Sequence, residues 1–145
     1  MILTTQVLFP HEVPKCSLLS FVIECLKFDD PVHFQYDLHV DPHTFDILVP
    51  LIEDHPVFQT NSQTPQLPVA YQLSITLYQF GHFGSSAAMK GVAQFARCSK
   101  GVVVKSTWHV MIAFMPLHDQ AICWPNAEEK HEALDWVESV SCHAW

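Results

Sequence analysis

The prolines most constrain how this chain can fold, because they limit the length of each regular element. The chain has ten Pro and only four Gly. Proline lacks a backbone N–H and is tolerated in a helix mainly in the first turn. The pairs Asp30-Pro31 and Asp41-Pro42 therefore predict an N-cap followed by the first helical residue. The sequence indicates several short helices rather than a few long ones.

The spacing of apolar residues predicts helices along most of the chain. Apolar side chains recur at three- and four-residue steps, as on one face of a helix. The expected helices cover residues 17–28, 31–34, from 42 to a kink or early end at Pro50, 69–80, from a Ser85 or Ser86 cap to about 96, from a Ser99 cap to Pro116, and 126–139. Residues 55–68 should form a loop, and residues 1–9 a single strand. The predicted fold is all-α: a small helical bundle with an irregular N-terminal segment and a C-terminal helix.

Carboxylates are absent from one long stretch of this acidic protein. Nine of the fifteen Asp and Glu residues precede His55, and the other six follow His118. The stretch between them contains four of the seven basic residues and carries +4, and the remainder carries 3 − 15 = −12, which gives the formal charge of −8. A surface without carboxylates suits a polyanionic partner. The alternative interpretation is that this stretch is apolar and buried.

The last two helices of the segment 73–117 are joined by a turn of only a few residues. This pattern is typical of a helix-turn-helix, which presents its final helix to the DNA major groove. Most three-helix segments are nevertheless ordinary core structure. If this one binds DNA, Lys90 and Arg97 should contact phosphates. Ser99, Lys100, Lys105 and Trp108 should contact DNA from the third helix.

Several motifs resemble Harbinger-type transposases, in particular the fungal members of that superfamily. The similar runs are TFDILV at 44–49, HPVFQ at 55–59, QLPVAYQLSITLYQFGHFG at 66–84, VA at 92–93, VMIAF at 110–114 and WPNAEEK at 124–130. The resemblance covers residues 29–145 and, more weakly, the beginning of the chain. It implies a nuclear, DNA-binding region with a helix-turn-helix at about 68–118.

In the family, this region precedes an RNase H-like nuclease domain with three metal-binding carboxylates. The resemblance implies that the first of these would follow the final residue, Trp145, so no catalytic residue, metal or cofactor is expected in this chain. The expected organisation is an N-terminal arm with short helices over 1–40, a helical core over 41–118, and a connecting helix over 119–145. A cluster of Cys123, His131, Cys142 and His143 matches no zinc-motif spacing.

The chain departs from the family pattern at positions that should face DNA. Arg97 stands where family members usually have Gly between the two helices, and an αL turn disfavours arginine. Trp108 and His109 replace a usual pair of arginines, and Gln79 replaces another. The DNA-facing set then comprises the six residues above together with His109, with fewer certain positive charges.

Two other functions are compatible with the sequence. Apolar residues make up 49% of the chain and charged residues only 15%. Such a composition suits an interaction module that docks on a nuclease domain or on a second transposon-encoded protein. A degenerate transposase fragment without present activity is the other alternative. The five cysteines form no CxxC pair and should be reduced, and no apolar run is long enough to span a membrane.

Overall fold

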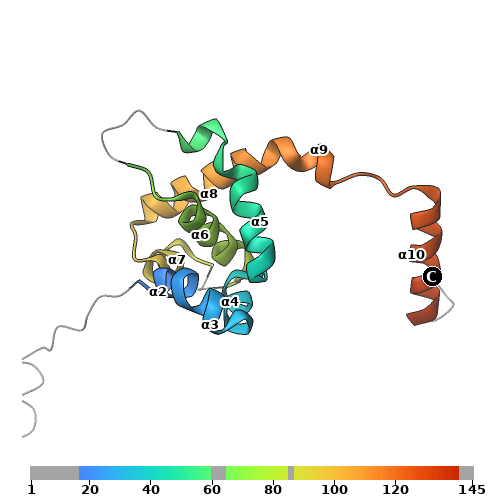
Figure 1. Cartoon of the computed structure of the whole chain (residues 1–145), viewed down its shortest axis with the longest axis horizontal. Helices are drawn as coiled ribbons and strands as arrows, with labels where there is room; N and C mark the ends of the chain where they lie inside the picture. Colours follow the sequence, from blue (N-terminus) through green and yellow to red (C-terminus); the bar gives the residue numbers. More distant parts are fainter. Residues whose placement is uncertain (1–16, 60–64, 85–86, 141–145) are drawn as a thin grey trace, which may run out of the picture. The chain divides into compact units, whose positions relative to one another are not determined.

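The described part of the protein is helical throughout. The computed structural model describes residues 17–59, 65–84 and 87–140, and all regular structure in these ranges is helical (Figure 1). The elements are α2 (Leu18–Phe21), the π-helical turn η1 (Val22–Leu26), α3 (Lys27–Asp29), α4 (Pro31–Leu38), α5 (Pro42–Glu53), η2 (Pro56–Phe58), α6 (Val69–Gly81), α7 (Met89–Ala96), α8 (Lys100–Phe114), η3 (Met115–Leu117), α9 (His118–Ala121) and α10 (Ala127–Val140). The all-α prediction is confirmed. The strand predicted for residues 1–9 lies outside the described residues.

The chain divides into two compact units, Met1–Ala113 and Phe114–Trp145. The first unit contains the helices of residues 18–38, which were expected in a separate arm. These helices bury apolar side chains in the same core as the later ones. The buried residues among them are Leu19, Val22, Leu26, Phe34 and Leu38. They pack against α6 and α7, so the described part of the expected arm belongs to the helical core.

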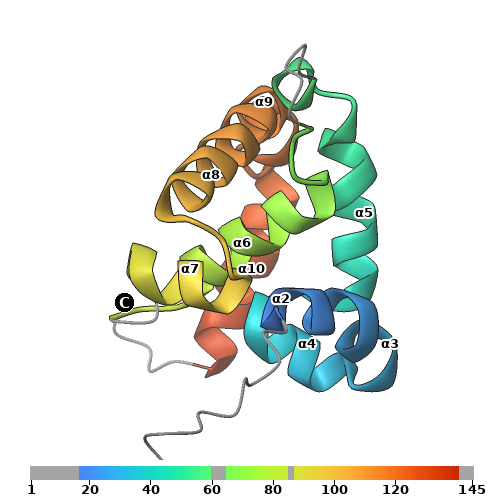
Figure 2. The same ribbon diagram turned by 90° about the vertical axis from the view of Figure 1, so that its left-hand side faces the viewer.

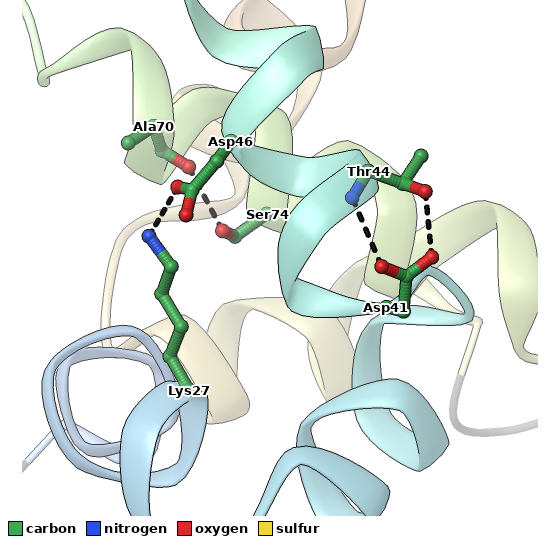
Figure 3. A network of polar contacts seen from close by, with 6 residues as sticks. All are labelled: Lys27, Asp41, Thr44, Asp46, Ala70 and Ser74. Carbon is green, nitrogen blue, oxygen red and sulfur yellow. Dashed lines mark hydrogen bonds and ion pairs between the residues drawn. The ribbon is translucent and has the colours of Figure 1, made fainter.

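The two Asp-Pro pairs begin helices as predicted. Asp30 caps α4 by accepting a hydrogen bond from the backbone N–H of His33 at 3.1 Å. Asp41 caps α5 by accepting from the Thr44 N–H at 3.0 Å and from the Thr44 hydroxyl at 2.6 Å (Figure 3). These bonds satisfy N–H groups that have no partner within the helix. Helix α4 runs to Leu38, four residues beyond the end predicted from the sequence.

Pro50 does not end α5, which continues to Glu53. An interior proline removes one backbone hydrogen bond and costs about 3 kcal/mol in an exposed helix. Phe45 and Ile52 lie on either side of this proline, and both side chains are buried. We attribute the continuation of the helix to this burial, which offsets the missing hydrogen bond. An ion pair between Lys27 and Asp46 also ties α3 to α5 (Figure 3).

Helix α6 lies in the middle of the first unit and packs against α2, α4, α5 and α7 (Figure 2). Five consecutive residues, from Gln72 to Thr76, are buried, so the helix is enclosed on all sides there. The buried part of α6 is therefore wider than a single apolar face, whereas Phe80 near its end is 61% exposed. Ser74 and Thr76 each donate to a carbonyl four residues earlier, at 2.8 and 2.9 Å. Their hydroxyls are thus satisfied inside the core.

Helix α7 begins later than predicted. Ala88 occupies its N-cap position and makes no side-chain cap bond, whereas Ser85 and Ser86 lie outside the described residues. The buried side chains of α7 are Val92 and Phe95, and Met89 is exposed. The Phe95 ring stacks on that of Tyr78 from α6, with centroids 3.8 Å apart. This stacking fixes which face of α7 is inward.

The remaining helix ends follow the predictions. Ser99 caps α8, and the α-helix stops at Phe114, two residues before Pro116. In the second unit, Asn126 and Glu129 form a reciprocal capping box at the start of α10. The Glu129 N–H donates to Asn126 Oδ1 at 2.9 Å, and the Asn126 N–H donates to Glu129 Oε2 at 2.8 Å.

Candidate nucleic-acid interface

The turn between α7 and α8 is fixed by backbone hydrogen bonds. Arg97 adopts the left-handed conformation, with φ 50° and ψ 42°. The Arg97 N–H donates to the Gln94 carbonyl at 3.3 Å, and the Cys98 N–H donates to the Ala93 carbonyl at 3.1 Å. The Val102 N–H then donates to Ser99 Oγ at 3.2 Å. This short turn holds the first residues of α8 in a defined place after α7.

Six of the seven residues predicted to face DNA are exposed on α7, in this turn or on α8. They are Lys90 on α7, Arg97 and Ser99 in the turn, and Lys100, Lys105 and Trp108 on α8. Their basic members are the four cations of the carboxylate-free stretch. Four exposed basic residues thus lie on α7, in the turn and on α8, although the whole chain is acidic.

His109 is the member of the set that turns inward. Its Nδ1 lies 3.1 Å from Gln72 Oε1, and its ring meets the edge of Phe58 with centroids 6.0 Å apart. Burial, and to a smaller extent the nearby Lys105 charge, lower the pKa of His109 below its usual value. The imidazole is therefore mainly neutral at pH 7. It contacts Gln72 of α6 and does not present a positive charge to a phosphate.

Gln79, where the resemblance described above predicts arginine, connects three helices. Its Oε1 accepts a hydrogen bond from the Thr107 hydroxyl of α8 at 2.8 Å. Its Nε2 lies 3.9 Å from the sulfur of Met89 on α7. This role was missed from the sequence, where no signal distinguished a glutamine that joins helices from one that faces solvent.

The outward side of α8 is more apolar than a DNA-facing helix requires. Val103, Ser106, Val110 and Ala113 are buried on its inner side. The opposite side exposes four large apolar side chains, Val104, Trp108, Met111 and Ile112, which we call the outer stripe. Lys100 and Lys105 lie on the same helix and are exposed. The surface thus combines positive charge with apolar area.

Within the described ranges, no group of three or more His, Cys, Asp or Glu side chains is arranged to hold a metal ion. Cys25, Cys98 and Cys123 are free thiols, and burial raises the pKa of Cys98. No described helix combines the length and the apolar character needed to cross a membrane. No family model matches the chain, and no curated protein or solved structure is significantly similar to it.

The positive φ of Arg97 should cost the folded protein stability, and substitutions at this position can measure that cost. Glycine adopts this conformation without the steric penalty that any Cβ incurs. We expect Arg97→Gly to be more stable than Arg97→Ala by about 1 kcal/mol in urea unfolding. Both variants lose the arginine side chain and its contacts, so their difference reports the backbone alone. Equal stabilities would show that the turn is unstrained in solution.

Proposed function

We propose that the surface formed by α7, the Arg97–Ser99 turn and the start of α8 binds double-stranded DNA, as part of a nuclear protein derived from a Harbinger-type transposase. The observation that carries the proposal is the exposure of four basic residues on α7, in the turn and on α8, in a stretch without Asp or Glu. The proposal includes no catalytic step and no cofactor.

Phosphate contacts supply most of the binding energy in this proposal. Lys90 and Arg97 would hold the backbone on one side of the groove, and Lys100 and Lys105 would enter with α8. Trp108 would offer an apolar contact to a thymine methyl group. Because each phosphate contact releases counterions from the DNA, binding should be strongest at low salt. The overall charge of −8 opposes binding, and this repulsion is screened as salt rises.

The lysines of α8 provide the test of this proposal. We expect the double variant Lys100→Ala with Lys105→Ala to weaken duplex binding at least about tenfold, as measured by fluorescence anisotropy at low salt. Each lost phosphate contact should also reduce the slope of log affinity against log salt by about 1, giving about 2 in total.

Lys130→Ala is the matched control, because Lys130 is exposed on α10 and lies outside the carboxylate-free stretch. This variant should leave the salt slope unchanged. The proposal fails if the protein does not bind duplex DNA at micromolar concentration. It also fails if the double variant binds as the wild type does.

The outer stripe of α8 favours a second candidate function, that of a protein-interaction module. Trp108 is 60% exposed at its centre, and Val104, Met111 and Ile112 surround it. Apolar surface of this kind is usual where a partner protein docks, and Trp and Met are enriched at such sites. In this function α8 would bind a protein rather than the DNA groove.

A further inference from the structure

The outer stripe of α8 defines the chemistry of a partner. Its four side chains fall on adjacent turns, at positions 104, 108, 111 and 112, and are between 40% and 60% exposed. Helix α8 contains no carboxylate, and Lys100 and Lys105 are both exposed on it. A well-matched partner would therefore present apolar side chains within an acidic surface.

Helix α10 has these properties. Ala133, Trp136, Val137 and Val140 follow the i, i+3, i+4, i+7 spacing that places them on one side of a helix. The helix contains five carboxylates and one lysine, so its charge is 1 − 5 = −4. On its polar side, His131 lies 3.8 Å from Asp135. α10 is therefore an acidic amphipathic helix.

The short length of α10 favours docking on a partner, because docking would stabilise the helix. It has fourteen residues, and an isolated helix of that length is only marginally stable in water. Its Trp136 and Val140 side chains are 66% and 62% exposed. Docking of this apolar side would stabilise the helix and cover the side chains that are costly to leave in water.

We propose that α10 of one chain docks on the outer stripe of α8 in a second copy of the chain. The proposal rests on the second candidate function, because it names the partner that α8 binds. Trp108 would pack against the Trp136 side of α10, and the −4 charge of α10 would meet the exposed Lys100 and Lys105 of α8. Laying an amphipathic helix on an apolar helical surface is a common mode of recognition. Since every copy carries both surfaces, reciprocal docking closes a dimer.

Light scattering after size exclusion tests the proposal on the full chain. We expect wild-type protein to be dimeric at micromolar concentration, and both Trp108→Glu and Trp136→Glu to raise the dimer dissociation constant at least about tenfold. The two tryptophans are 60% and 66% exposed, so neither variant disturbs the core. Tyr36→Glu, which alters a 73% exposed aromatic residue on α4, is the control and should remain dimeric.

Mixing the two tryptophan variants separates this pairing from a symmetric one. The Trp108→Glu chain retains α10, and the Trp136→Glu chain retains the outer stripe, so a mixture should form a 1:1 complex that neither variant forms alone. A dimer made by two α8 helices would not be restored by mixing, and this result would overturn the proposal.

The other outcomes are equally decisive. A monomeric wild-type chain would overturn the proposal. If Trp108→Glu leaves the dimer intact, the outer stripe is not a docking surface and the second candidate function fails with it. If Trp108→Glu dissociates the dimer but Trp136→Glu does not, the outer stripe docks a partner other than α10.

Discussion

Phe34→Ala is expected to lower the free energy of unfolding by about 3–5 kcal/mol, which is a large part of the total for a domain of this size. Phe34 is completely buried, and its ring meets that of Phe45 edge to face, with centroids 5.5 Å apart. The substitution removes a large apolar side chain and leaves a cavity between α4 and α5. It also removes an aromatic pair that contributes beyond the buried area.

Urea unfolding followed by circular dichroism measures this effect. Phe28→Ala is the matched control, because Phe28 is 72% exposed on α3 and undergoes the same chemical change. We expect the control to change stability by no more than about 0.5 kcal/mol. Comparable losses in the two variants would contradict the packing of α4 against α5.

The helix boundaries were predictable where a side chain signals them directly. Asp30, Asp41, Ser99 and Asn126 each accept a hydrogen bond from a backbone N–H two or three residues ahead. Such caps depend only on neighbouring residues, so the sequence alone determines them. The start of α7 was misplaced because Ala88, its N-cap residue, offers no such signal.

The buried faces were harder to predict, because they depend on contacts between distant residues. Gln72, Ser74 and Thr76 are buried although their side chains are polar. Apolar spacing cannot identify them, since their burial follows from the central position of α6 among its neighbours. Helix α8 presented the opposite difficulty. It carries apolar residues on its outer side as well as on its inner side, so their spacing did not show how much apolar area would stay exposed.

The sequence predicted which residues of the candidate site are exposed, except for His109, whose side chain faces inward. The exposure of Lys90, Lys100 and Lys105 follows from their charge, which is seldom buried without a partner. The inward orientation of His109 does not follow from its residue type, because histidine is found both in solvent and in polar contacts of the core. Its place was determined by Gln72, thirty-seven residues earlier in the chain.

The second large expected effect concerns Gln72, which joins three segments inside the core. Its Nε2 donates to the Leu67 carbonyl at 2.7 Å, and its Oε1 lies 3.1 Å from His109 Nδ1. The first bond fixes the orientation of the amide, so Oε1 accepts and Nδ1 carries the imidazole proton. Gln72→Leu retains most of the volume but leaves both partners unpaired. We expect it to cost about 1–3 kcal/mol in urea unfolding.

Gln94→Leu is the control for Gln72→Leu, because Gln94 is exposed on α7 and should be nearly neutral. A double-variant cycle with His109→Phe then isolates the contact between α6 and α8. In the His109→Phe background no imidazole N–H is left unpaired, so Gln72→Leu should cost at least about 0.5 kcal/mol less than in the wild type. Additive losses would show that the two side chains do not share a hydrogen bond.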